Sequence, residues 1–176
     1  PPAGGAGADE AAGRPGAGPS VAASSHPSVD PLLLEAVRWY TGAAGRMDDA
    51  RAAVLLERAA ADGDALSAMW LARVHSTGRM GYPEDPERAR AIAGGVIDRV
   101  EALAEAGVPE ARFLMGTAYA EGLGRARDDA RAAVWYRRAA EQAHLLASHN
   151  LGNVLAAGRG VGEDAAAAVR WWLAAS

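Results

Sequence analysis

The chain has 176 residues, a formal net charge of −4 at pH 7 and no cysteine. This length suffices for one ordinary domain, and the absence of cysteine excludes disulfides, thiolate metal ligands and cysteine nucleophiles. The net negative charge disfavours a nucleic-acid binder, and no apolar run approaches the ~20 residues that a membrane span needs. The compartment stays open, with a cytoplasmic location favoured over a periplasmic or secreted one.

Residues 1–29 are rich in Pro, Gly, Ala and Ser and offer almost nothing for a core to bury. Such a composition does not offset the entropy lost on ordering. We therefore expect a disordered linker or tail that tethers the rest of the chain. Because the chain lacks an initiator Met, we also expect it to be a fragment or a processed product.

From residue 30 onward every element is predicted to be helical. Asp30-Pro31 and Asp85-Pro86 each place an N-cap residue before a proline at the first helical position. Glycines punctuate the chain, β-branched residues are sparse and no useful stretch alternates with period two. The predicted fold class is all-α.

Residues 82–107 predict one long helix. Its apolar residues recur with the i, i+3, i+4, i+7 spacing of a buried helix face: Ala89, Ile92, Ala93, Val96, Ile97, Val100, Leu103 and Ala104. The pattern runs straight through Gly94-Gly95, where the two glycines cost roughly 1–2 kcal/mol of helix propensity and leave a kink open as an alternative.

The chain also repeats itself. The heptapeptide DDARAAV occurs at 48–54 and again at 128–134, with the two copies 80 residues apart. Shifting the chain by 36 residues superimposes Trp135 on Trp171 and Gly116 on Gly152, among seven coincidences in one register. One unit of 36 residues and one of 44 account for the spacing of 80. The intervening repeat is therefore longer by about two helical turns, which leaves its buried face unrotated.

The third unit, residues 111–144, carries the clearest motif. It resembles the Sel-one-like repeat family, relatives of the tetratricopeptide repeats, whose pattern is A-x4-G-x2-Y-x2-G-x-G-x3-D-x3-A-x2-W-Y-x2-A-A-x2-G. The matching residues are Ala111, Gly116, Tyr119, Gly122, Gly124, Asp128, Ala132, Trp135, Tyr136, Ala139 and Ala140. Ala143 stands where the family has Gly, the fourth unit has Leu155 and Trp172 at the two Tyr positions, and the first two units match less well.

This resemblance implies a right-handed α/α superhelical solenoid of about four helix-pair repeats over residues 30–176. The approximate units are 31–64, 65–108, 109–144 and 145–176. It also implies a non-catalytic scaffold or adaptor that binds a protein or peptide partner.

Stacked units must bury each other's apolar faces. We expect Gly116 and Gly152 on first helices to face the alanines of second helices. The seams between units would be filled by Trp135, Tyr136, Trp171 and Trp172. Because no polar capping helix follows Trp172, we expect the parent protein to continue, or the chain to self-associate through its uncapped C-terminal helix.

The repeated aspartates invite a metal or catalytic interpretation, but their position favours capping. Asp48, Asp128 and Asp164 each precede a helix, where a carboxylate accepts backbone N–H groups. Equivalent residues in stacked pairs lie roughly 10 Å apart, too far to converge on one ion. We therefore expect no metal site and no cofactor.

Four histidines remain. His26 lies in the tail, His75 is expected to be a packed or half-buried ring, and His144 at an inter-repeat turn is expected to face solvent. His149 occupies the position equivalent to Phe113. No H-x-x-x-H pair, serine elbow or phosphate-cradling loop accompanies them, so no catalytic residue is expected.

The first helices of such solenoids line the concave face. By register, one row of groove residues is Arg38, Arg73, Thr117 and Asn153. A neighbouring row is Leu34, Met69, Phe113 and His149, with Thr77, Glu110 and Glu121 at the edges. This mixture suits an extended peptide with a carboxylate and one apolar anchor.

The sequence leaves two alternative functions. Some cysteine-rich relatives have been linked to β-lactam hydrolysis, but this chain has no cysteine and no nucleophile–base pair. Helical-pair repeats of similar length also read RNA bases, which the net acidity and scattered arginines disfavour.

Overall fold

The computed structural model describes residues 28–175. The expected linker over residues 1–29 lies almost entirely outside this range. Within it, the structure contains helices and connecting turns and no strand. The helices in chain order are α1 (Pro31–Thr41), α2 (Asp49–Ala61), α3 (Ala65–Thr77), α4 (Pro86–Glu105), α5 (Pro109–Glu121), α6 (Asp129–Ala140), α7 (Leu145–Ala156) and α8 (Ala165–Ala174).

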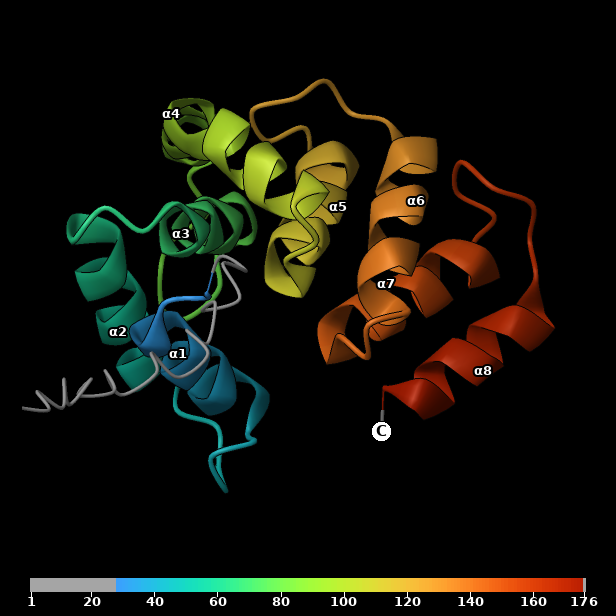
Figure 1. The fold of residues 1–176 in the computed structure, drawn as a ribbon, viewed down its shortest axis with the longest axis horizontal. Coiled ribbons are helices and arrows are strands. Elements are labelled where there is room, and N and C mark those ends of the chain that lie inside the picture. The colour runs from blue at the N-terminus through green and yellow to red at the C-terminus, as the bar shows by residue number, and fades with distance from the viewer. Residues whose placement is uncertain (1–27, 176) are drawn as a thin grey trace, which may run out of the picture.

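Consecutive helices pack as pairs, α1 with α2, α3 with α4, α5 with α6 and α7 with α8. Each second helix also contacts the first helix of the next pair, and α5 contacts both α3 and α7. Figure 1 shows the pairs following one another along an arc, with α1 and α7 facing each other across its open side. The predicted all-α solenoid of helix-pair repeats is confirmed.

Aspartate caps start most of the helices. The side chain of Asp48 accepts the backbone N–H of Arg51 at 3.0 Å, and Asp128 accepts that of Arg131 at 2.9 Å. The same capping bond occurs in α1, α3, α4 and α8, at Asp30, Asp64, Asp85 and Asp164. The capping interpretation of the repeated DDARAAV is therefore confirmed.

Within a pair, a glycine of the first helix lies against an aromatic ring of the second. A Cβ atom added to Gly116 would lie 2.4 Å from Cδ1 of Tyr136, and one added to Gly152 would lie 2.4 Å from Nε1 of Trp172. The expectation that these glycines face alanines is wrong, because the second-helix side chain that crosses each glycine is a ring. The close approach itself is present.

The seam aromatics differ between units. Trp135 and Tyr136 are buried in the third unit, whereas Trp171 is half-buried and Trp172 is 37% exposed at the end of the solenoid. Val169 and Leu173 beside them are also exposed. Self-association through α8 stays a prediction.

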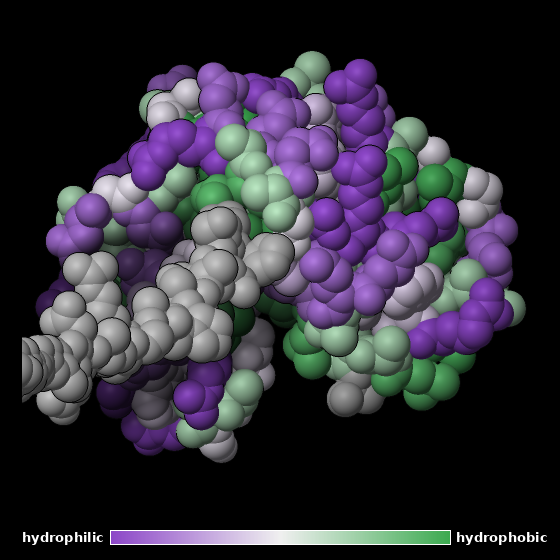
Figure 2. Space-filling view, in the orientation of Figure 1, coloured by the Kyte–Doolittle hydropathy of each residue, from purple (hydrophilic) through white to green (hydrophobic). Residues whose placement is uncertain are grey.

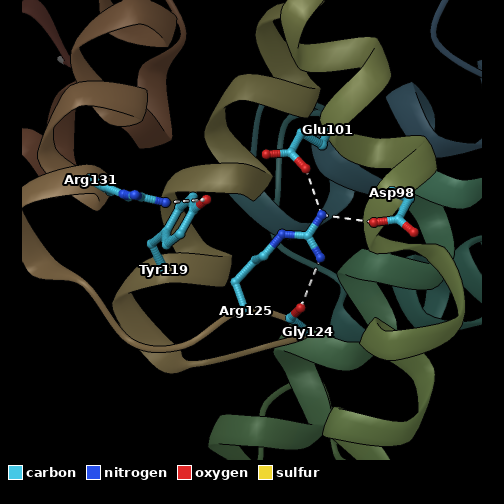
Figure 3. Close-up of polar contacts among 6 residues, drawn as sticks. All are labelled: Asp98, Glu101, Tyr119, Gly124, Arg125 and Arg131. Atoms are coloured by element: carbon cyan, nitrogen blue, oxygen red, sulfur yellow. Dashed lines mark hydrogen bonds and ion pairs between the residues drawn. The ribbon is translucent and has the colours of Figure 1, made fainter.

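Helix α4 runs unbroken through Gly94 and Gly95, which face open space. Its extra length provides an anchor for the next unit. The guanidinium of Arg125, in the α5–α6 connection, donates to Asp98 at 2.8 Å and to Glu101 at 2.5 Å, both on α4 (Figure 3). These bonds raise the pKa of Arg125 above its ordinary value. Beside it, Gly124 lies so close to Ile97 that an added Cβ would be 2.9 Å from that residue's Cβ.

His75 is a packed ring, as expected. It is 3% exposed on α3, and its ring lies 4.7 Å from that of Tyr82. Burial and the charge of Arg88 lower the pKa of His75 below its ordinary value, and its Nδ1 is buried without a hydrogen-bond partner. The folded state therefore holds His75 neutral.

No helix within residues 28–175 combines the length and the apolar character that crossing a membrane requires.

We predict that Gly116→Ala destabilises the fold. The new methyl group has to displace the ring of Tyr136, an overpacking that costs about 1–3 kcal/mol. The matched control is Gly94→Ala, where nothing lies within 4 Å and helix propensity favours Ala by up to about 1 kcal/mol. Urea unfolding of both variants measures the difference, and a Gly116→Ala midpoint at or above that of the wild type would contradict the packing described.

We predict that His75 makes the fold less stable in mild acid. In the unfolded chain it titrates near its ordinary pKa of 6.5, and in the folded chain it titrates lower. The stability that neutral His75 gives the folded state is therefore complete above the unfolded pKa. It is lost as the pH falls from the unfolded pKa toward the lower folded pKa. Denaturant unfolding between about pH 7 and 5 should show a steeper loss for the wild type than for His75→Gln. Identical pH slopes would show that His75 is not held neutral.

Candidate functional site

A polar pocket of about 280 Å³ opens between the second, third and fourth helix pairs. We call it the Arg73 pocket. It is built from α3 and the turn that follows it, the end of α5, α6 between Asp129 and Tyr136, and α7 with its following turn. Its lining residues are Arg73, Arg79, Ala120, Glu121, Asp129, Ala132, Tyr136, Asn150, Asn153, Val154 and Arg159. Three of the predicted binding residues, Arg73, Glu121 and Asn153, meet here.

Arg73 has an unusual environment for a charged residue. It is only 6% exposed, and its Cζ lies 4.9 Å from the ring centroid of Trp70, 5.6 Å from Phe113 and 5.9 Å from Tyr40. Within the described chain no carboxylate forms an ion pair with it, and its Nη1 is buried without a hydrogen-bond partner. Aromatic faces offset part of the cost of burying this charge, but leave a donor unused.

Arg79 strengthens the positive potential on the same side. Its Nη1 donates to the hydroxyl of Tyr40 at 2.9 Å. Burial acts to raise the pKa of Tyr40, but the charges and hydrogen bonding of Arg73 and Arg79 outweigh it, so that this pKa is lowered below its ordinary value. A phenol that ionises more readily despite burial reports a positive local potential.

The two acidic residues of the pocket already have neighbours. Glu121 accepts a hydrogen bond from the hydroxyl of Ser76, and Asp129 pairs with Arg127 at 3.3 Å. Three arginines against two carboxylates leave the pocket lining with one net positive charge.

The floor of the pocket is held by second-helix and α7 side chains. Tyr136 is buried, and its hydroxyl donates to Oγ1 of Thr117 at 3.3 Å. Burial raises the pKa of Tyr136 and so keeps it neutral. On α7, Oδ1 of Asn153 accepts the indole N–H of Trp172 at 3.1 Å, which fixes the orientation of the amide.

Three of the predicted groove residues are fully buried instead. Met69 and Phe113 are 0% exposed and Thr117 is 1% exposed, so none of them offers a surface to a partner. The reason is the packing of the inner helices. Helix α5 contacts α3 and α7 as well as its own partner α6 and the preceding α4, so the face expected to point into the groove is covered.

Glu110 is buried too, within a polar chain. Its Oε1 accepts the indole N–H of Trp70 at 2.6 Å, and its Oε2 lies 2.9 Å from Nε2 of His144. Because Nδ1 of His144 accepts the backbone N–H of Ala147 at 3.2 Å, Nε2 carries the proton and donates to Glu110. His144 also stacks on Phe113 at 4.8 Å. The expectation that His144 faces solvent is wrong, because it caps α7 from inside the interface.

Other predicted residues do lie at the surface but apart from Arg73. Arg38 and Leu34 line a separate pocket on α1 with Glu35 and Trp39. Thr77 borders another pocket near Glu121 and Arg90, and His149 is exposed on α7. The structure thus joins Arg73, Glu121 and Asn153 and does not join Arg38 to them.

The sequence reasoning missed Arg79, Arg159, Asn150 and Asp129. The first two had a usable signal, because Arg79 and Arg159 are 80 residues apart, each directly after a glycine with positive φ. They are the same turn position in the second and fourth units. Asp129 follows the capping residue Asp128 and lines the pocket.

An apolar pocket of about 500 Å³ lies across the open side of the arc. It is lined by Tyr40, Thr41, Met47, Asp49, Leu145 and Leu146, and therefore joins the first unit to the fourth. Met47 is 73% exposed and Leu145 is 47% exposed. Figure 2 shows the molecule hollowed between these two sides. In the described part of the chain, no group of histidines and carboxylates is arranged so that it could hold a metal ion.

Comparison with known proteins identifies the repeats. The family model described as Sel1 repeat matches residues 40–64, 65–92, 109–144 and 145–176. No curated protein matches the chain.

Two solved structures are similar. One is a protective antigen of uropathogenic Escherichia coli strains with an SLR fold, at 24% identity and a TM-score of 0.46 over 82% of this chain. The chain spans 37% of that protein. The other is a Sel1 repeat protein from Oxalobacter formigenes, at 28% identity and a TM-score of 0.45, covering 69% of this chain and 86% of that one. Because the family model matches most of the sequence, the chain belongs to the Sel1 repeat family.

Proposed function

We propose that the chain is a non-catalytic scaffold that binds a protein or peptide segment on the concave face, the inner side formed by α1, α3, α5 and α7. Sel1 repeat proteins are generally protein-interaction scaffolds, and this membership gives the class of function. The observation that supports the concave face is the Arg73 pocket, which draws donors from three helix pairs to one place.

The physical argument rests on what each face offers. The outer helices α2 and α6 each expose a single large apolar residue, Val54 and Val134, at 63% and 52% exposure, and isolated apolar residues of this kind are ordinary for a surface. The inner side instead has two hollows, one polar and one apolar, with polar groups converging in the first. Convergent polar groups in a concavity are the usual form of a binding site.

The accessible members of the predicted set carry the contact in this proposal. Glu121 and Asn153 line the Arg73 pocket, and Thr77 on α3, His149 on α7 and Arg38 on α1 are exposed on the inner helices. The buried members, Met69, Phe113 and Thr117, act from beneath by holding the inner helices in place.

Site-specific photo-crosslinking tests this proposal. A photoreactive amino acid is placed at Thr77 or His149 on the inner side, or at Val54 or Val134 as matched outer controls. In the cells that make the protein, we expect the inner positions to crosslink to a common protein and the outer positions to give no such band. Crosslinks from Val54 or Val134 that equal or exceed those from the inner positions would place the contact on the outer face and contradict the proposal.

A further inference from the structure

We infer that the Arg73 pocket binds a peptide carboxylate, which pairs with the buried guanidinium of Arg73. This inference rests on the proposed function and names the chemistry of the group that the scaffold recognises. The carboxylate comes either from an acidic side chain or from a C-terminus, and the test below separates the two.

The first support is the unused donor. Buried charges in folded proteins are normally paired, because taking an ion out of water is costly. Arg73 is 6% exposed, has three aromatic rings within 6 Å of Cζ, and leaves Nη1 without a partner. Because Arg73 lines the pocket, a carboxylate bound there supplies an acceptor for its guanidinium, and a planar guanidinium matches a carboxylate with two parallel N–H···O bonds.

The second support is the balance of charge. The pocket has one net positive charge, since Arg73, Arg79 and Arg159 face Glu121 and Asp129. A carboxylate carries one negative charge and neutralises this lining. A phosphate group carries close to two negative charges at pH 7 and would meet the two resident carboxylates at close range. The lining therefore selects a carboxylate over a phosphate.

The lowered pKa of Tyr40 agrees with this balance. Its phenol lies beside Arg73 and Arg79, and their influence exceeds the opposing effect of burial. The potential at this edge of the pocket is thus positive before any ligand arrives.

The third support is the surrounding hydrogen-bonding capacity. Asn150 and Asn153 lie three residues apart on one face of α7, and both line the pocket. Their amides offer donors and acceptors suited to a peptide backbone. Tyr40 then connects this pocket to the apolar one, because it contacts Arg73 on one side and lines the hollow with Met47 and Leu145 on the other. In a bound peptide, the side chain next to the carboxylate-bearing residue can lie in this apolar pocket.

The test is a titration of the ¹⁵N-labelled full chain followed by nuclear magnetic resonance. Four short probes separate the possible sources: N-acetyl-Leu-Glu-amide, N-acetyl-Leu-Gln-amide, N-acetyl-Leu-Leu with a free C-terminus, and N-acetyl-Leu-Leu-amide. The signals to follow are the Nε–H of Arg73 and the side-chain amides of Asn150 and Asn153.

We expect saturable shifts of these signals with at least one carboxylate probe and at least tenfold weaker binding of its neutral counterpart. A response to N-acetyl-Leu-Glu-amide assigns a side-chain carboxylate, and a response to free N-acetyl-Leu-Leu assigns a C-terminus. Equal shifts with charged and neutral probes, or no shift with any carboxylate, would overturn the inference.

Variants locate the effect. Arg73→Gln should weaken binding of the carboxylate probe at least tenfold, while Arg137→Gln, at an exposed arginine of α6 that does not line the Arg73 pocket, should leave this binding unchanged. Because Arg73 is buried, Arg79→Gln at an exposed position provides a second variant, with a severalfold loss expected. If neither Arg73→Gln nor Arg79→Gln weakens binding, the carboxylate binds elsewhere and the inference fails.

Failure here is separable from failure of the proposed function. If the inner positions crosslink but no carboxylate probe shifts the pocket signals, the carboxylate inference is refuted and the scaffold proposal stands. Crosslinks confined to the outer face refute the scaffold proposal itself.

Discussion

Each of the last two helix pairs closes around a glycine on its first helix and an aromatic ring on its second. Gly116 lies under Tyr136 and Gly152 under Trp172, at distances that leave no room for a Cβ atom. This contact sets how closely the helices of a pair approach, and hence the angle at which one pair stacks on the next. Because no single pair buries its own apolar face, these close approaches also bear on how the third and fourth pairs stack.

The arc in turn determines what happens to the inner helices. Helices α3 and α5 lie between neighbours, and most of their residues are buried. Arg73 is enclosed by this packing: the rings of Tyr40, Trp70 and Phe113 belong to three successive units and surround its guanidinium. A charge that would be solvated on an isolated helix is thus largely shielded from water, and Arg73 still lines the Arg73 pocket. The stacking that stabilises the solenoid also creates the site.

The parts of this fold that are local in sequence could be predicted. Asp48 and Asp128 cap their helices because a cap depends only on the next three residues. The repeat register gave the helix pairs, and the spacing of apolar residues gave the unbroken α4. The identity of the ring over Gly116 could not be predicted, since it depends on the crossing angle of two helices. The burial of Met69, Phe113 and Thr117 depends on a third and fourth helix in space, so register alone misplaced them in an open groove. His144 was misplaced for the same reason, because its partner Glu110 lies 34 residues away.

The pocket residues show a further limit of sequence reasoning. Arg79 and Arg159 share a turn position and could have been found by comparing the units at non-matching positions. Asn150 had no such signal. The unused Nη1 of Arg73, which gives the site its chemistry, is visible only once the rings around it are in place.

The central claim is that the buried guanidinium of Arg73 serves to bind a ligand and does not stabilise the fold. The thermal unfolding midpoint of Arg73→Met in the free protein tests it most directly. Replacing an unpaired buried charge with an apolar side chain of similar length is neutral or stabilising. The account therefore predicts a midpoint equal to or above that of the wild type. A midpoint lowered by several degrees would show that the guanidinium stabilises the solenoid itself, and would contradict the claim.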